Sequence, residues 1–572
     1  MASRRVCTMA TLAAVVIAVS LWSGSAEAQT LRETIAAKET ALDRLALRAS
    51  AAYSGRCATL SGCVSGSTQC TIPACGSDFP SNRGFNCTSN YGTAPDVCGA
   101  SCSGMVRSTT ASTVRIPPST SFTNAEVQAF VCSSNVMTNE FITQHQNGNG
   151  PLKAWSYVAH SSGSIRTYPG SPQGRSANSC DSYDARLRPW YIAASSGPKD
   201  IVFVLDKSGS MSRDSGVNGR SRWSLMVEAT ATILDTLTQN DFVSIVLFDS
   251  ASFVLGGRTR MIRADAAGIN ALKSELNAAG PGGGTDFTSG FTRAFPLFTS
   301  SVEETSRCTR VMVFLTDGIA GDSESSQDAA IANGQASLRA FGNQQEARIF
   351  TFSMSSGSDD TRPRRIACAN GGVWAKIADG ENPLNKMTGY YNFLASGIDS
   401  TTVRWTTPYI DSFGLGRMVT GGRAIYDRSG AVPVLVGVAA TDVTMTELEQ
   451  YGSFSSVVSE LISRSNVCPA LNLTDCQIQH LREQSGYRCP GTPTAAACAN
   501  AAEIAQPTSC SSQGSLNDYF CTNLGTTSRI ATSGSQSTAA VSCCGTGCNG
   551  ATSSSIFAAI AVVTVAIAAS LF

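Results

Sequence analysis

The stretch from Asp200 to Ser212, "DIVFVLDKSGSMS", joins an apolar strand to a loop of small polar residues. The uninterrupted apolar run is typical of a strand that is covered on both faces, as in a parallel sheet. The run ends in Asp206, and Ser208 and Ser210 follow at a spacing of two, so a turning loop can direct all three side chains at one point. Ligands of open α/β sheets bind at the carboxyl ends of the strands. We therefore predict a binding site where this strand ends.

Similar apolar runs and helical patterns alternate for about two hundred residues after this strand. The further strands are predicted at "FVSIVLF" (242–248), "RVMVFLTDG" (310–318), "ARIFTFSM" (347–354) and "GGVWAKI" (371–377), and the helices at 223–237, 266–279, 325–341 and before Thr401. This alternation predicts an α/β domain with a doubly wound, mostly parallel sheet over residues 199–398.

Two more oxygen-bearing residues are placed like the first three. Thr285 lies in "GGGTDF", a loop between helical patterns, and Asp317 lies in "FLTDG", just past a later strand. Two carboxylates and three hydroxyls suit a hard divalent cation, and we predict Mg²⁺, or Ca²⁺ or Mn²⁺, at Asp206, Ser208, Ser210, Thr285 and Asp317. Taken alone, each piece has an ordinary alternative as a loop or a helix cap. Three pieces in order at the same end of one sheet favour the cation.

This constellation resembles the metal-ion-dependent adhesion site of von Willebrand factor A domains, with all five positions present. In that family an acidic group from a partner fills the last coordination position of the ion. The resemblance therefore implies a binding site for a protein that offers an acidic group.

The segments on either side of the A domain carry a second resemblance. "WSYVAHSSGSIRTYPG" and "SYDARLRPWYIAA" before it, and "WTTPYIDSFGLGRMVTGGRAIYDRSG" with "LVGVAATDV" after it, look like two halves of one extracellular Cache domain of the α+β class. An A domain inserted into a Cache domain is the layout of voltage-gated calcium channel alpha-2/delta subunits. The resemblance covers residues 153–463 and omits the cysteine-rich regions. It implies Cache halves at 29–198 and 399–466 and a role as a channel subunit.

A motif in the first Cache half resembles the amino-acid-binding motif of Cache sensors. The matching residues are Tyr183, Arg188, Trp190 and Tyr191, in the spacing Y-x4-R-x-W-Y, with Tyr409 and Asp442 downstream. Arg188 could grip the carboxylate of a free α-amino acid, and Asp442 could face its ammonium group. The alternatives are core packing for the aromatic residues and a surface position for Arg188.

The ends of the chain predict export to the cell surface. Two arginines, an apolar run and "SAEAQT" form a signal peptide over residues 1–28. The tail 549–572 has small residues from Asn549, a short polar spacer and an apolar end, which favours a GPI-attachment signal. The alternative is a short spanning helix, and either one would anchor the protein on the extracellular face of the plasma membrane.

Cysteine usage agrees with an oxidising compartment. The chain has 21 cysteines, of which Cys7 leaves with the signal, and most of the others lie in 57–102 and 467–548. They predict disulfide-rich modules, although the connectivity does not follow from sequence. Asn86 and Asn472 stand in glycosylation sequons.

Charge and histidine content narrow the function class. Lys plus Arg and Asp plus Glu number 42 each, so nucleic acid is not an expected partner. The rival class is a secreted or surface metal-dependent hydrolase. However, His145, His160 and His480 lie in none of the sequences that mark a nucleophile elbow or a zinc protease. We predict a binding protein and not an enzyme.

Overall fold

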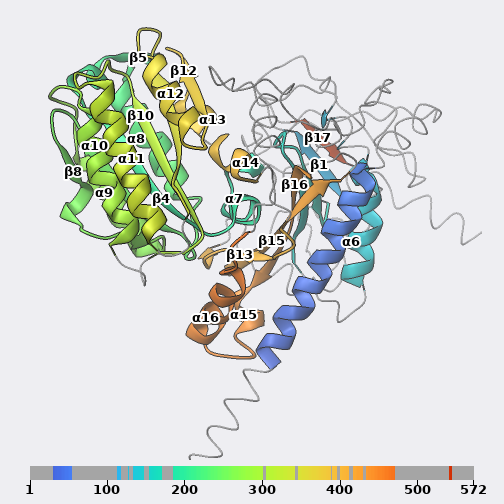
Figure 1. Ribbon diagram of the computed structural model, residues 1–572. Helices are drawn as coiled ribbons and strands as arrows, with labels where there is room; N and C mark the ends of the chain where they lie inside the picture. The colour runs from blue at the N-terminus through green and yellow to red at the C-terminus, as the bar shows by residue number, and fades with distance from the viewer. Residues whose placement is uncertain are drawn as a thin grey trace, which may run out of the picture.

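The computed structural model describes residues 30–54, 112–116, 126–127, 130, 133–146, 154–170, 184–300, 305–341, 345–387, 389–395, 400–410, 416–428, 433–469 and 540–543. These residues form two units that lie side by side, each around one large sheet (Figure 1). The predicted signal peptide, the 57–102 insertion, Tyr183, Asn86, Asn472, His480 and the 549–572 tail lie outside them, as does most of 467–548.

The first unit is built on the predicted parallel sheet. Its parallel strands run in the order β12 (Trp374–Ile377), β11 (Arg348–Met354), β10 (Thr309–Thr316), β4 (Lys199–Asp206) and β7 (Phe242–Phe248). Two short strands that the sequence did not predict, β8 (Ser252–Val254) and β9 (Ile262–Arg263), pair antiparallel with β7. A small hairpin of β5 (Asp214–Val217) and β6 (Arg220–Ser221) follows the loop after β4.

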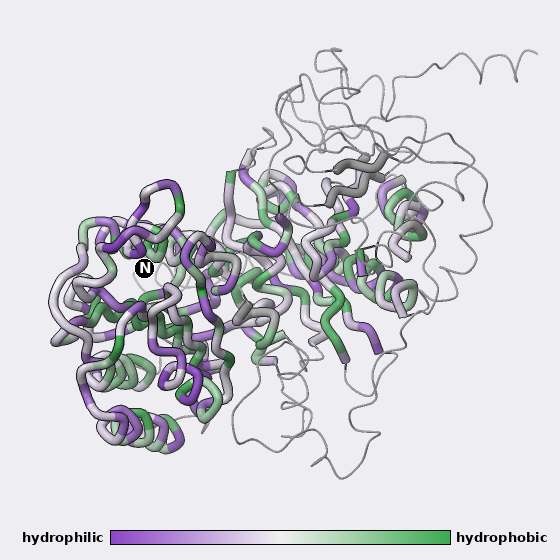
Figure 2. The backbone as a smooth tube through the Cα atoms, turned by 90° about the horizontal axis from the view of Figure 1, so that it is seen from above, coloured by the Kyte–Doolittle hydropathy of each residue, from purple (hydrophilic) through white to green (hydrophobic). Residues whose placement is uncertain are grey.

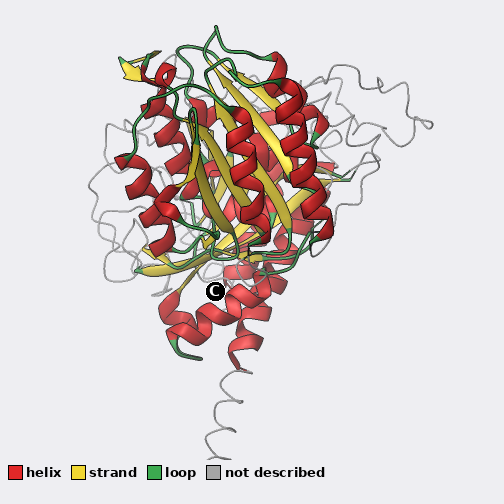
Figure 3. Ribbon diagram, turned by 60° about the vertical axis from the view of Figure 1, so that its left-hand side comes forward, coloured by secondary structure: helices red, strands yellow, loops and turns green. Residues whose placement is uncertain are grey.

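Helices cover both faces of this sheet (Figure 3). They are α8 (Arg222–Leu234), α9 (Ala266–Ala278), α10 (Phe287–Ala294), α11 (Glu324–Ala340), α12 (Thr361–Ala369), α13 (Pro383–Met387) and α14 (Gly389–Ala395), with short 3-10 turns at Gly209–Ser212, Leu255–Gly257 and Phe295–Thr299. The predicted helices correspond to α8, α9, α11 and the pair α13 and α14. Two helices, α10 and α12, were not predicted, because both are short and carry a glycine or a proline.

The two helical layers explain why β4 is apolar throughout. Ile201, Phe203 and Leu205 belong to the core cluster that includes α8 and α9. Val202 and Val204 belong to the cluster that includes α10 and α11 on the other face. All five side chains are fully buried, and each stabilises the fold by roughly 1.5–3 kcal/mol. In Figure 2, the helices that cover this sheet carry both hydrophobic and hydrophilic segments.

The second unit combines strands from both sides of the first unit. Its sheet order is β13 (Arg404–Trp405), β15 (Arg417–Asp427), β16 (Val434–Thr444), β2 (Ser156–His160), β3 (Ile165–Tyr168), β1 (Thr113–Ile116) and β17 (Ala540–Cys543), with β14 (Tyr409–Ile410) beside β15. The pairings are antiparallel and include two hairpins, β2–β3 and β15–β16, whose turn sequences "SSGS" and "DRSG" predict them.

Helices at 30–54, α6 (Met137–Gln146), α15 (Met445–Leu448) and α16 (Phe454–Ser465) complete this unit, with 3-10 turns at Ser134–Val136 and Ala185–Leu187. Residues 31–52, with apolar positions at helical spacing and charges between them, form the first of these helices, as the pattern predicts. Residues 445–462 also have a helical pattern, and the structure divides them into two helices. The helix stops after Leu448 and a new one starts at Phe454, because Ser453 caps α16 by accepting a hydrogen bond from the Ser456 N–H (3.3 Å).

The two units are joined by α7 (Pro189–Ser196) and by a disulfide. Trp190 and Tyr191 of α7 lie in the same core cluster as β4 of the first unit and β16 of the second. Cys308 at the start of β10 is bonded to Cys468 after α16, with Cα atoms 5.0 Å apart. The predicted use of cysteines in disulfides is confirmed for this pair.

Candidate metal site and a second polar pocket

The first site lies where the direction of strand connection reverses. The chain runs from β4 to β7 on one side of β4 and later returns to β10 on the other side. Loops that leave the carboxyl ends of β4 and β10 therefore diverge, and this is where open α/β sheets bind ligands. Asp206 is the last residue of β4, and Asp317 directly follows β10.

Asp206 is a fully buried carboxylate. Its Oδ1 accepts a hydrogen bond from the Ser208 N–H (2.7 Å), and its Oδ2 accepts one from the Thr316 hydroxyl (2.5 Å). Burial raises the pKa of Asp206 to about 6, and the negative charge of Asp317 also raises it, although these hydrogen bonds act in the opposite direction. A positive charge beside Asp206 would therefore stabilise the ionised form of its carboxyl group.

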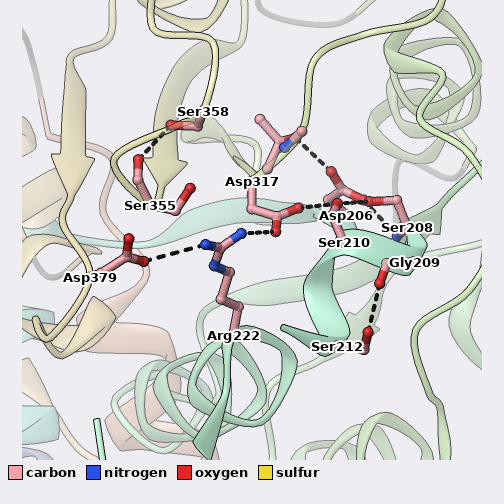
Figure 4. A network of polar contacts seen from close by, with 12 residues as sticks. Asp206, Ser208, Gly209, Ser210, Ser212, Arg222, Asp317, Ser355, Ser358 and Asp379 are labelled. Atoms are coloured by element: carbon pink, nitrogen blue, oxygen red, sulfur yellow. Dashed lines mark hydrogen bonds and ion pairs between the residues drawn. The ribbon is translucent and has the colours of Figure 1, made fainter. Parts of the chain in front are cut away.

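Two serine hydroxyls connect this carboxylate to the second one. Ser208 and Ser210 have their Oγ atoms 3.0 Å apart, and the Ser210 hydroxyl donates to Asp317 Oδ1 (2.6 Å; Figure 4). Ser208 and Asp317 are almost completely buried. The short 3-10 turn Gly209–Ser212 brings the two serines to the same side of the loop.

Thr285 reaches the same place from the loop between α9 and α10. Backbone hydrogen bonds fasten that loop to the serine loop, from the Gly209 N–H to the Gly283 oxygen (3.0 Å). A Cβ atom added to Gly318 would lie 3.0 Å from Thr285 Oγ1 and 3.6 Å from Asp206 Oδ2. The lack of a side chain at Gly318 thus leaves room between a hydroxyl and a carboxylate.

All five predicted metal ligands therefore meet at one edge of the sheet, and their chemistry fits a hard divalent cation. The donors are oxygens from two carboxylates and three hydroxyls. Within the described part of the chain, no three His, Cys, Asp or Glu side chains gather as a metal site. The candidate thus depends on hydroxyl groups, which is unlike a zinc or copper centre.

A second cluster of polar side chains surrounds Asp442 on β16. Asp442 is 5% exposed, and its Oδ1 accepts hydrogen bonds from Thr420 Oγ1 (2.7 Å) and the Tyr409 hydroxyl (3.3 Å). The Tyr157 hydroxyl donates to its Oδ2. The ring of Tyr157 in turn stacks on Trp190, with centroids 5.8 Å apart.

The structure brings together four of the six residues of the predicted amino-acid motif. Tyr409 donates directly to Asp442, Tyr157 connects Asp442 to Trp190, and Tyr191 is buried beside Trp190. Arg188 is exposed at the N-cap of α7. Tyr183 lies outside the described residues.

Comparison with known proteins decides the family of the first unit. Residues 201–319 match the von Willebrand factor type A domain family. This chain carries a von Willebrand factor type A domain. The match covers β4 and β10 and therefore includes both carboxylates of the candidate site.

The chain is also homologous, over about half its length, to calcium channel alpha-2/delta subunits. It is similar to the voltage-dependent calcium channel subunit alpha-2/delta-2 of Mus musculus, with 27% identity over 330 residues, covering 55% of this chain and 27% of that protein. The chain thus spans about a quarter of the length of the curated relatives it matches. These relatives are channel subunits and not enzymes, and A domains are mainly binding modules, in agreement with the predicted class.

Among solved structures, the chain is similar to a von Willebrand factor type A protein from Catenulispora acidiphila, at 16% identity and a TM-score of 0.29, covering 44% of this chain and 68% of that one. Another is proximal thread matrix protein 1 from the mussel byssus, with a zinc-occupied MIDAS motif, at 20% identity and a TM-score of 0.26, covering 34% of this chain and 45% of that one. A domains commonly bind a divalent metal at such a motif.

Sequence reasoning missed two residues of the A-domain site. Thr316 holds Asp206, and Arg222 of α8 forms an ion pair with Asp317 Oδ2 (2.7 Å). Thr316 carried a weak signal, because it is a hydroxyl in an apolar strand directly before Asp317. Arg222 carried another, because it starts a helix, where a positive charge is unfavourable. In the second pocket, Tyr157 and Thr420 were missed.

Where the structure describes the chain, no helix is both long and apolar enough to span a bilayer. The alpha-2/delta relatives are extracellular, membrane-associated proteins.

Proposed function

We propose that this protein binds partners at the cell surface through a divalent cation held by its A domain. The observation that supports the proposal is the convergence of Asp206, Ser208, Ser210, Thr285 and Asp317 beside Gly318, where the lack of a side chain leaves room between Thr285 and Asp206. Mg²⁺ is the preferred ion, with Ca²⁺ or Mn²⁺ as substitutes. The ion would supply a positive centre to which an acidic side chain of a protein partner could bind.

The residues of the chain would share this task. The hydroxyls of Ser208, Ser210 and Thr285 would offer neutral oxygen ligands. Asp206 and Asp317 would supply negative charge and hold the serine loop, since Asp206 accepts from the Ser208 N–H and Asp317 accepts from the Ser210 hydroxyl.

The homology suggests where this binding takes place. We propose an accessory role at an ion channel, on the extracellular face of the plasma membrane, after export by the 1–28 signal. The proposed anchor is the 549–572 tail, with GPI attachment at Asn549. Glycans at Asn86 and Asn472 would accompany export.

The proposed division places the A domain at 199–398, between Cache halves at 29–198 and 399–466, and a cysteine-rich module at 467–548.

Calorimetry with Mg²⁺ alone tests the cation site directly. The purified ectodomain should take up about one Mg²⁺ per chain. Asp206→Ala should abolish this binding and retain the wild-type thermal unfolding in EDTA. A capture experiment from intact cells should then recover partners in Mg²⁺ and lose them in EDTA or with Asp206→Ala. Mg²⁺ binding that survives Asp206→Ala would contradict the proposal.

A second candidate function is binding of a free α-amino acid in the Asp442 pocket. A specific observation favours it: a nearly buried carboxylate is surrounded by hydroxyls and faces a stacked Tyr157–Trp190 pair. Asp442 would accept hydrogen bonds from the ammonium group. Arg188, Tyr183 and Tyr191 are the proposed partners of the carboxylate end.

This candidate is tested by thermal shift and calorimetry with each of the twenty amino acids. Asp442→Ala should weaken binding by about 2–5 kcal/mol, because Asp442 is nearly buried, and Arg188→Ala should weaken it less, because Arg188 is exposed. Arg186→Ala is the matched control, because Arg186 forms an ion pair with Asp184 (2.6 Å). Absence of any response from folded protein would leave the aromatic residues as core.

A further inference from the structure

Arg222 occupies an unusual position for a cation. It is the first residue of α8, where the exposed N–H groups of the helix carry partial positive charge. A positive side chain is unfavourable there unless a negative group compensates for it. The compensating group is Asp317 of the candidate metal site.

The contact between these residues is close and well shielded. Arg222 Nη1 lies 2.7 Å from Asp317 Oδ2, and the side chains are 12% and 0% exposed, respectively. The other oxygen of Asp317 accepts the Ser210 hydroxyl. Asp317 therefore directs one oxygen to the cation loop and the other to a guanidinium of its own chain (Figure 4).

Several neighbours hold Arg222 in place. Its backbone N–H donates to the Arg213 oxygen (3.0 Å). Its Nη2 lies 3.5 Å from Asp379, a carboxylate that accepts a hydrogen bond from the Ser356 hydroxyl (3.1 Å). The β5–β6 hairpin, which leads into Arg222, is fastened beside Asp379 by a hydrogen bond from the Gly380 N–H to the Ser215 oxygen (2.8 Å). The guanidinium is thus a fixed part of the site.

We propose that Arg222 is a built-in countercharge that weakens cation binding to the A-domain site and strengthens binding of an acidic ligand once the cation is bound. This inference rests on the proposed function of that site. Arg222 would in this way help to select carboxylate ligands, although it lies outside the five-residue motif.

The reason is the net charge around the ion. The two candidate ligand carboxylates, Asp206 and Asp317, and the guanidinium that contacts Asp317 sum to a single negative charge. Asp379, which lies 3.5 Å from the other end of the guanidinium, is 39% exposed and is therefore more strongly screened by solvent and salt. A divalent cation adds two positive charges, which attract an incoming carboxylate. Removing Arg222 makes the site one charge more negative both before and after the cation binds. The same residue therefore acts in opposite directions on the two binding steps.

The test compares Arg222→Gln with the wild-type ectodomain in both steps. Calorimetry with Mg²⁺ alone should give a Kd about tenfold lower for Arg222→Gln. Titration of the Mg²⁺-saturated protein with an acetylated, amidated Gly-Glu-Gly peptide should give a Kd about tenfold higher. Both differences should shrink as NaCl concentration rises, because salt screens charge.

Two further variants separate charge from structure. Arg213→Gln removes an exposed arginine from the same loop and should leave both constants unchanged. Arg222→Lys retains the positive charge and should keep both constants within about threefold of wild type. Thermal unfolding in EDTA reports whether each variant is folded, and Arg222→Met, which also removes the charge, replaces Arg222→Gln if the latter is not.

The outcomes distinguish this inference from the proposed function. If the wild type binds no Mg²⁺, the proposed function fails and the inference fails with it. If the wild type binds Mg²⁺ but Arg222→Gln leaves both constants unchanged, or shifts both in the same direction, the inference alone is overturned. Opposite shifts in the two steps support it.

Discussion

The two ends of β4 carry the same residue in the same degree of burial. Asp200 near the amino end and Asp206 at the carboxyl end are both fully buried. Burial raises the pKa of each to about 6. Each carboxylate also accepts a backbone hydrogen bond, from the Ser306 N–H to Asp200 (2.6 Å) and from the Ser208 N–H to Asp206 (2.7 Å).

Their charged neighbours differ. At the amino end, the positive charge of Arg310 favours ionised Asp200 and outweighs the opposing charge of Asp241, which forms a fully buried pair with Lys199 (3.1 Å). At the carboxyl end, Asp206 faces a second carboxylate, Asp317.

The two ends of β4 also differ in their exposure to solvent. The amino end lies at the junction of the two units, near the Cys308–Cys468 disulfide. At the carboxyl end, Ile319 next to the candidate site is 69% exposed. Burial and a raised pKa therefore do not by themselves identify a binding site. We place the proposed cation site at the carboxyl end, because two carboxylates lie close together there beside an exposed residue.

The largest expected effect on the free energy of unfolding comes from removing the buried arginine at the amino end of β4. Arg310 is 4% exposed, and its guanidinium donates to the backbone oxygens of Leu338 (3.2 Å) and Phe341 (3.2 Å). Arg310→Met should lower the free energy of unfolding by about 3–5 kcal/mol, because it leaves buried acceptors and Asp200 without their cation. Urea unfolding in EDTA measures this loss.

A surface arginine provides the control for this prediction. Arg339 is 53% exposed and pairs with Glu346, so Arg339→Met should cost less than about 1 kcal/mol. If both variants lose the same unfolding free energy, the buried charges at the amino end of β4 contribute no more to stability than a surface ion pair.

A smaller effect is expected from pH, acting through Asp200. Its folded-state pKa of about 6 exceeds the ordinary value of 3.8, so the folded protein retains a proton that the unfolded chain releases. The stability that Asp200 contributes is therefore complete below the unfolded pKa and is lost as pH rises through the folded pKa. Between about pH 4.5 and about pH 7, this loss should amount to about 2 kcal/mol.

Asp200→Asn removes the titrating group and should flatten this part of the pH dependence. Urea unfolding at the two pH values, in EDTA for both proteins, gives the comparison. An unchanged pH dependence in Asp200→Asn would mean that the carboxylate is ionised throughout this range, as an ordinary surface aspartate would be.

The sequence predicted the carboxyl end better than it predicted the amino end. Asp206 and Asp317 stand directly after apolar strands, so their common edge followed from the parallel sheet alone. Arg222 could not be placed, because its contact with Asp317 spans 95 residues and depends on the path of the β5–β6 hairpin. The interaction between Asp200 and Arg310 at the amino end could not be predicted for the same reason, since the two residues meet only through the β4–β10 pairing.

The second pocket illustrates the same limit through strand register. Thr420 lies directly opposite Asp442 in the β15–β16 ladder, and Tyr157 lies opposite Ala440 in the β16–β2 ladder. Both hydroxyls therefore reach the same face as Asp442. The β2–β16 register joins residues about 285 positions apart, as in the Tyr157–Asp442 hydrogen bond. Sequence patterns predict strands, but they do not align strands across an intervening domain.

The smallest expected effect tests the space at the carboxyl end. A Cβ atom on Gly318 would lie 3.0 Å from Thr285 Oγ1, closer than side chains normally pack, so Thr285 would have to shift by a few tenths of an ångström. Gly318 does not have a left-handed backbone, so Gly318→Ala should change the unfolding free energy in EDTA by less than about 1 kcal/mol. Mg²⁺ affinity should nevertheless fall about tenfold, the low end of what disturbed supporting contacts cost a metal site.

Gly357→Ala is the matched control, because a Cβ atom there meets nothing within 4 Å. Calorimetry with Mg²⁺ on the three proteins decides the point. If Gly318→Ala binds Mg²⁺ as tightly as Gly357→Ala and the wild type do, the cation is not held between Thr285 and Asp206, and the openness of this end of β4 has another purpose.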